Sequence, residues 1–329
     1  MKRRGVTKRE VAASIGALAL SAVAPGGARA QVAGRPITII VPYSPGTGID
    51  ILARSIATDL SQRFGQAVVV DNRTGASGNI GTGMAARATP DGNTLLMIAK
   101  VFVVNPSLFK SVPYDPVTSF DPIIKLATGT IVLAVHPSVP ANDVREFIAY
   151  VKSQPPGSVN YGSAGFATPH HLSMELFKQA AGVNLTHIPY KGTSGVMTDL
   201  IGNHVSAMFI PTHVALPFMR DQQIRVLGVA GRERSAAVPE VPTLHEQGLG
   251  EVENDLWFGL LAPAGTPPEI VRRIQEEIAR ALGTAKMREL LASQGLVVVA
   301  STPTDFAARI GSEVAKWRKV IREAGITLE

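Results

Sequence analysis

The chain contains no cysteine among its 329 residues. This absence excludes a disulfide framework, a thiolate nucleophile and a cysteine-ligated metal site. It also leaves no cysteine at the end of the basic and apolar N-terminal segment to carry a lipid. We therefore expect a protein that is not lipidated.

Long apolar runs are also missing, because none approaches the roughly 20 residues that a membrane-spanning helix needs. An uncharged run of 14 residues, 11–24, follows five basic residues and precedes Ala28-Arg-Ala30. This order is typical of a signal peptide, here residues 1–30. Arg3-Arg4 is part of an incomplete twin-arginine motif, so the Sec and twin-arginine routes both stay open. We expect removal of this leader to leave a soluble periplasmic protein.

Positive charge is concentrated in the leader. Six of the 32 basic residues and one of the 26 acidic residues lie in residues 1–30, so the remainder carries 26 basic and 25 acidic residues, a net charge of +1. No basic stripe remains that would indicate a nucleic-acid partner.

Patterns for metal binding and for hydrolysis are absent as well. His170 and His171 are adjacent, so on a helix they point about 100° apart and cannot share a metal ion. His187 and His204 are scattered, and no Gly-x-Ser-x-Gly motif of a serine hydrolase occurs. We expect neither a metal nor a cofactor.

What the chain does contain is an alternation of short apolar runs and helical periodicity. The expected strands are 37–41, 67–70, 94–99, 131–135, 205–210, 224–230, 256–261 and 296–300, and the clearest helices are 49–64, 268–282 and 303–324. This alternation predicts an α/β fold with mostly parallel sheets that are flanked by helices.

Two turn-rich stretches, 114–122 and 248–255, are candidate crossings between domains. The first domain then comprises residues 31–126 and 251–329, and residues 127–250 form a second domain inserted into it.

A glycine-bearing turn, 44–50, joins the first strand to the first helix. Helix N-termini carry free N–H groups, and glycines at 46 and 48 let a ligand approach the backbone, so this turn predicts a small anion site. The turns 72–81, 161–172 and 188–195 repeat this arrangement, with Thr168 as a helix cap and Pro169 after it. Four such turns, two in each expected domain, indicate a ligand cleft between the domains.

The side chains of these turns leave alternatives open. Asp50 either tightens its turn or contacts the ligand directly, and Arg73 either pairs with Asp71 or binds the ligand. Lys191 is a further cation within a candidate loop that could reach a ligand. Tyr43, Tyr190 and Phe209 could line a pocket, although Phe209 is equally suited to the core.

The turns belong to longer motifs that extend from residue 37 to the C-terminus. These are 45–54, 65–73 with Gly75, Gly78 and Gly81, 90–95, 161–165 with His171-Leu172, 189–192, 199–202, 241–243 and 257–267. Jointly they resemble the substrate-binding proteins of tripartite tricarboxylate transporters, also called the Bug family of extracytoplasmic solute receptors.

This resemblance implies a two-lobed periplasmic-binding-protein fold with a central cleft. It implies a monomer that captures a small carboxylate, such as a dicarboxylate, an amino acid, an aromatic acid or a citrate-like acid, and delivers it to membrane permease subunits. The expected ligand-binding residues are Tyr43, Ser44, Gly46, Thr47, Gly48, Asp50, Ala76, Ser77, Gly78, Ser163, Gly165, Ala167, Thr168, His170, Tyr190, Lys191, Gly192 and Thr193.

Two positions depart from the family pattern: Thr47 replaces a glycine, and Ser206 replaces an acidic residue. Both leave the identity of the ligand open. The alternative is an exported nicotinamide-dependent oxidoreductase, because Gly46-Thr-Gly48 and Asp71 match part of a dinucleotide-binding motif, although its third glycine is replaced by Ile51.

Overall fold

The computed structural model describes residues 35–326. The expected signal peptide therefore lies outside the described residues. Between residues 35 and 326, no helix is both long enough and apolar enough to cross a membrane.

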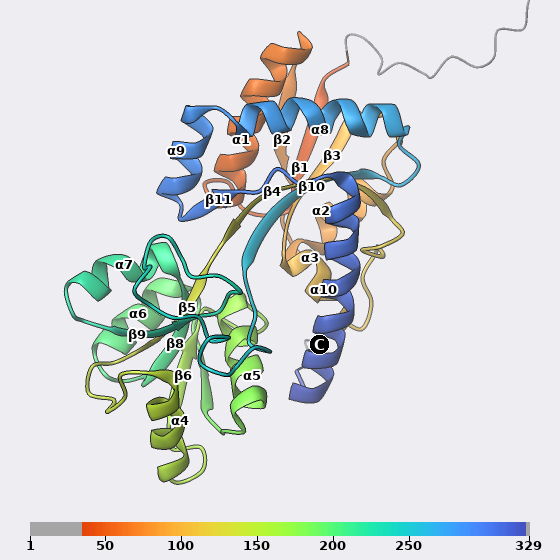
Figure 1. Cartoon of the computed structure of the whole chain (residues 1–329). Helices are drawn as coiled ribbons and strands as arrows, with labels where there is room; N and C mark the ends of the chain where they lie inside the picture. Colours follow the sequence, from red (N-terminus) through yellow and green to blue (C-terminus); the bar gives the residue numbers. More distant parts are fainter. Residues whose placement is uncertain (1–34, 327–329) are drawn as a thin grey trace, which may run out of the picture. The chain divides into compact units, whose positions relative to one another are not determined.

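The first of two sheets has six strands in the order β11-β4-β10-β3-β1-β2 (Figure 1). The strands are β1 (Ile37–Val41), β2 (Val68–Asn72), β3 (Thr94–Ala99), β4 (Phe120–Gly129), β10 (Leu256–Pro263) and β11 (Leu296–Val298). β1 is parallel to β2 and β3, whereas β10 is antiparallel to β3 and β4, and β11 to β4.

The second sheet has five strands in the order β7-β6-β8-β5-β9. They are β5 (Ile131–Val135), β6 (Asn160–Ser163), β7 (Thr186–Pro189), β8 (Ala207–Pro211) and β9 (Arg225–Val229). β6 is parallel to β7 and β8, and β5 is antiparallel to β8 and β9.

Both sheets are thus mixed, and the expectation of mostly parallel sheets is wrong. The antiparallel pairs involve the strands that carry the chain between the sheets, since β4 leads through Thr130 into β5 and the chain returns from β9 to β10. Such strands are not joined to their neighbours by a helical crossover, so nothing requires them to be parallel.

β4 also lies partly where the sequence indicated a turn, at Asp121-Pro122. Proline cannot donate a ladder hydrogen bond, but Pro122 sits at a register shift in the pairing with β10. Pairing with β10, which continues to Phe120, therefore extends this strand across a residue that usually ends one.

Helices pack against both sheets, and those of the first sheet cover both of its faces. They are α1 (Gly48–Phe64), α2 (Asn79–Ala86) after a short 3-10 turn η1 (Ala76–Gly78), α3 (Val101–Leu108), α4 (Val144–Ser153), α5 (Pro169–Ala181), α6 (Thr193–Ile201), α7 (Thr212–Arg220), α8 (Pro268–Leu282), α9 (Ala285–Ser293) and α10 (Pro303–Ala324). Alternate strand residues face opposite ways, so Ile39 packs with the α1 and α8 side chains and Ile40 with the cluster that includes α3 and α10.

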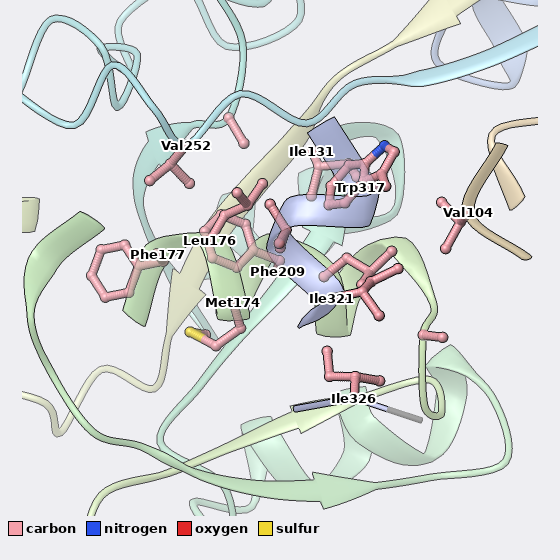
Figure 2. Close-up of a cluster of buried hydrophobic side chains, with 14 of the residues drawn as sticks. Val104, Ile131, Met174, Leu176, Phe177, Phe209, Val252, Trp317, Ile321 and Ile326 are labelled. Atoms are coloured by element: carbon pink, nitrogen blue, oxygen red, sulfur yellow. The ribbon is translucent and has the colours of Figure 1, made fainter. Parts of the chain in front are cut away.

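The C-terminal helix α10 connects the cores of the two sheets. Figure 2 shows Trp317 and Ile321 of α10 near Met174 and Leu176 of α5 and Phe209 of β8. These side chains belong to one buried cluster that also contains Leu96 and Ile98 of the first sheet. Phe209 is fully buried in this core and does not line a pocket.

Candidate functional site

The first predicted turn links β1 to α1, and its side chains bond within the turn. Thr47 is the N-cap residue of α1, but its hydroxyl donates to the Ser44 carbonyl oxygen at 2.8 Å and does not cap the helix. Gly46 adopts a φ of 81°, and its N–H donates to Asp50 Oδ2 at 2.9 Å. The N–H groups of the first turn of α1 therefore receive no side-chain cap.

The Asp50 carboxylate accepts hydrogen bonds from other residues of the protein. Its Oδ2 accepts from Gly46 N and from Arg54 Nε at 3.0 Å, and its Oδ1 accepts from Asn72 Nδ2 at 2.9 Å. The carboxylate is buried, which opposes its charge, but these hydrogen bonds together lower its pKa below the ordinary value. The geometry favours the interpretation in which Asp50 tightens the turn.

The second turn holds four consecutive residues in the left-handed region. The φ angles are 123° at Gly75, 47° at Ala76, 55° at Ser77 and 91° at Gly78. Alanine and serine adopt this conformation at a cost of about 1 kcal/mol each, so other contacts must hold the loop. One of these contacts is the hydrogen bond from Asn105 Nδ2 to the Ser77 carbonyl oxygen at 3.0 Å.

The third turn leads from β6 into α5 and is closed by its own side chains. Ser163 Oγ and Thr168 Oγ1 both donate to the Gly165 carbonyl oxygen, at 3.0 and 2.7 Å. Ala167 has a φ of 59°, and its N–H donates to His171 Nδ1 at 2.9 Å.

Because the Thr168 hydroxyl is used in the turn, it does not cap α5, and Pro169 has no N–H. The backbone N–H groups of the next two residues are therefore left without a side-chain acceptor. By contrast, Asp143, Thr284 and Thr302 accept hydrogen bonds from the first turns of α4, α9 and α10.

A cavity of about 210 Å³ lies between the second and third turns. It is lined by Tyr43, Ser77, Val101, Asn105, Leu108, Phe166, Ala167, Thr168 and Pro169, none of which carries a charge. Four of these residues, Tyr43, Ser77, Ala167 and Thr168, were expected from the sequence. The cavity joins loops that follow strands of the first sheet to the loop that precedes α5.

Sequence reasoning missed the other five lining residues. Val101, Asn105 and Leu108 lie on one face of α3 at spacings of four and three residues. In the sequence this stretch is a short apolar run, which indicates a core helix rather than a pocket. Phe166 lay within a predicted turn, and its 55% exposure could not be read from the sequence.

The remaining predicted residues do not line this cavity and stay candidates. Among them, Tyr190 donates its hydroxyl hydrogen bond to Asp199 Oδ2, and burial together with this bond raises the pKa of Tyr190 to about 12. Lys191 is exposed. His170 is buried with both ring nitrogens unpartnered, and burial lowers its pKa to about 4. The others are Ser44, Gly46, Thr47, Gly48, Asp50, Ala76, Gly78, Ser163, Gly165, Gly192 and Thr193.

A second hollow, of about 270 Å³, lies on the other side of Phe166 and is lined partly by His171 and His187. These two imidazoles stack with their centroids 4.1 Å apart, and Phe166 meets both edge-on. Burial lowers the pKa of His171 to about 3 and that of His187 to about 4, so both are neutral near pH 7. Within residues 35–326, no cluster of three or more His, Asp or Glu side chains could hold a metal ion.

Comparison with known proteins matches residues 52–326 to the model of a family described as tripartite tricarboxylate transporter family receptor. The structure of periplasmic binding protein BugD is 32% identical, covers 89% of this chain and 99% of that chain, and has a TM-score of 0.71. R. palustris Rpa4515 with adipate is 34% identical over 89% and 99% of the chains, with a TM-score of 0.74. MatC from Rhodopseudomonas palustris with bound malate is 30% identical over 87% and 99%, with a TM-score of 0.71.

These likenesses confirm the expected periplasmic-binding-protein fold, with two α/β lobes built on the two mixed sheets.

Proposed function

Because the chain belongs to the tripartite tricarboxylate transporter receptors, a family of periplasmic solute-binding proteins that includes Bug proteins, we propose that it captures a small carboxylate in the cavity between Ser77 and Thr168. It then delivers this acid to membrane permease subunits. In this proposal the protein is an exported monomer that catalyses no reaction.

The uncapped N-terminus of α5 is the observation that carries this proposal. Thr168 and Pro169 line the cavity, and the N–H groups that follow them have no side-chain acceptor. A helix N-terminus carries roughly half a positive charge and binds anions through such groups. No Lys or Arg lines the cavity, so backbone dipoles, together with the Tyr43 and Ser77 hydroxyls, are the groups available to hold a carboxylate.

The walls of the cavity suit the carbon chain of a small acid. Val101, Leu108 and Phe166 provide apolar surface, while the N-terminus of α5 lies at Thr168 and Pro169. Apolar walls with a few placed polar groups are usual in small-molecule sites. The related proteins crystallised with adipate and with malate support a carboxylate as the class of ligand.

We also propose that the lobes are divided near residues 126 and 251 and that they close around the ligand by a hinge motion. In support of this division, β4 and β5 are consecutive strands of different sheets, and the chain returns to the first sheet at Leu256. Closure would exclude water from the carboxylate and strengthen its interaction with the backbone dipoles.

A panel of acids tests the capture. Purified chain lacking residues 1–30 is titrated calorimetrically with succinate, malate, adipate, citrate, aspartate and benzoate. A ligand at 100 times its dissociation constant should add about 2.7 kcal/mol to the free energy of unfolding. Stabilisation by sugars or cations but by no acid would contradict the proposal.

Two substitutions test the location. Val101→Phe adds a ring at the cavity wall and should weaken binding about tenfold or more, which is 1.4 kcal/mol. The matched control is Lys286→Ala, which changes a separate hollow between α1 and α9 and should leave affinity unchanged. Equal affinities in the two variants would place the acid elsewhere.

Two further measurements address the rest of the proposal. Cells that lack this gene should lose uptake of the acid identified in the panel. Titration with NADH and NADPH separates capture from the oxidoreductase alternative, because saturable binding of either cofactor would favour the enzyme.

A further inference from the structure

Asn105 lines the cavity and carries a buried hydrogen-bond acceptor that has no partner among the described residues. The residue is 1% exposed and lines the cavity from α3, and its Oδ1 is buried without a hydrogen-bond partner among residues 35–326. A buried polar atom that lacks a partner is costly and rare in native proteins, so its presence calls for an explanation.

The orientation of the amide follows from its neighbours. Asn105 Nδ2 donates to the Ser77 carbonyl oxygen at 3.0 Å and to Asn79 Oδ1 at 2.7 Å. A backbone carbonyl can only accept, so rotating the amide by 180° would set two acceptors against each other at Ser77. Oδ1 is therefore kept free as the acceptor, while the amino group holds the left-handed loop.

None of the donors on the cavity wall, the Tyr43 and Ser77 hydroxyls included, makes a hydrogen bond to Oδ1. Apolar side chains make up most of the wall, and the Thr168 hydroxyl donates to the Gly165 carbonyl oxygen. The Tyr114 hydroxyl, which lies behind α3, donates within its own surroundings, to Asn79 Oδ1 or the Phe102 carbonyl oxygen. Because Asn105 lines the cavity, a molecule bound there can supply the missing donor.

We propose that Asn105 Oδ1 accepts a hydrogen bond from a hydroxyl group on the bound acid, so that the site selects hydroxy-substituted carboxylates over their unsubstituted parents. This inference rests on the proposed function, because it concerns the same cavity. The carboxylate lies at the N-terminus of α5, the carbon chain contacts the apolar wall, and the hydroxyl reaches across to α3. An unsubstituted acid leaves the buried oxygen unpaired, and a polar site discriminates strongly against a ligand that does so.

Matched pairs of acids test this selectivity. The dissociation constants of butyrate and 3-hydroxybutyrate, and of succinate and malate, are measured by titration calorimetry on the unmodified protein. We expect the hydroxylated member of at least one pair to bind about tenfold more tightly than its parent. If parent and hydroxylated acids bind equally, the inference is overturned while the capture of carboxylates stands. If none of the four binds and no other carboxylate does, the proposed function itself fails.

Substitution at Asn105 separates contact with the ligand from support of the loop. Asn105→Leu and the milder Asn105→Ser should each bring the affinity ratio within the preferred pair close to one. A purely structural role would lower both affinities by the same factor and keep the ratio, which would overturn the inference. The matched control is Asn93→Leu. Asn93 is also buried with unpartnered amide atoms, but it precedes the first residue of β3, whereas the cavity lies beyond the last residue of that strand. This variant should keep the ratio of the unmodified protein.

Discussion

Lys100 Nζ lies 2.7 Å from Asp255 Oδ1 and donates to it, although Lys100 is only 3% exposed. The same ammonium group donates to Asn254 Oδ1 at 2.8 Å, and Asn254 Nδ2 in turn donates to the Pro169 carbonyl oxygen at 3.2 Å. One polar network therefore connects the residue before α3, the segment that returns the chain to the first sheet, and the N-terminus of α5. Two residues that line the cavity are linked to this network: Pro169 through its carbonyl oxygen, and Val101 as the residue that follows Lys100.

The substitution Asp255→Ala should strongly destabilise the protein. Burial opposes the charge of Asp255, but Lys100, Arg309 and Lys125 outweigh it and hold the pKa of this carboxyl far below its usual range. Removing the carboxylate leaves Lys100 buried with a reduced set of partners, and breaking such a pair costs about 3 kcal/mol. Urea denaturation measures the loss. The control Arg280→Ala breaks an exposed ion pair with Glu277 and should cost less than about 1 kcal/mol. Similar losses in both variants would contradict the role of the buried network.

Acid should weaken the fold through its buried histidines. Burial lowers the pKa of His170 to about 4, whereas the unfolded chain titrates near 6.5. The unfolded state therefore takes up a proton first, and the free energy of unfolding falls as pH decreases from about 6.5 to 4. For His170 alone the loss by pH 4 is about 3 kcal/mol.

The variant His170→Leu isolates this contribution. Denaturant unfolding at pH 7, 5.5 and 4.5 should show a smaller loss of stability for the variant than for the unmodified protein. Because both ring nitrogens of His170 lack partners, the variant should be about as stable as its parent at pH 7. Parallel pH profiles would show that His170 is not buried in its neutral form.

Two substitutions in the left-handed loop 75–78 should change the free energy of unfolding in opposite directions. Ala76→Gly should stabilise the protein by about 0.5–1 kcal/mol, because glycine adopts a φ of 47° without strain. Gly75→Ala should destabilise it by more than about 1 kcal/mol, since its φ is 123° and an added Cβ would lie 2.6 Å from Ile80 Cδ1. Thermal unfolding measures both changes. Destabilisation by Ala76→Gly would mean that the alanine side chain is itself required.

Phe166→Ala should separate ligand affinity from stability. The ring is 55% exposed, yet it lines the cavity and packs edge-on against His187 with centroids 5.0 Å apart. Its removal should weaken binding about tenfold, or 1.4 kcal/mol, while a half-exposed ring contributes less to folding than a buried one. Calorimetric titration and thermal unfolding of the same sample compare the two effects. A large stability loss with unchanged affinity would contradict this assignment.

Sequence signals within a few residues of each other determined many of the helix boundaries and strands of this protein. Helices α8 and α10 begin and end where periodicity, proline and Gly325 predicted, and Thr302 caps α10 through the Asp305 N–H. The apolar runs that became β1, β3 and β5 needed only their own composition. Such features depend on residues within a few positions of each other, so the sequence can specify them. The motifs that resemble a receptor family were likewise sufficient to predict the fold that the comparisons confirmed.

Contacts between distant segments decided the rest. The strand β4 crosses Pro122 because β10 pairs with it, and the antiparallel pairs arise where the chain passes between the sheets. Asn105 could not be recognised as a cavity residue, because the orientation of its amide depends on Ser77 and Asn79, and the cavity also needs Phe166 from the loop after β6. The sequence alone determined strands such as β1 and helices such as α8, whereas the tertiary structure decided the extent of β4, the uncapped N-terminus of α5 and which segments share a cavity, since burial and pairing are properties of the folded chain.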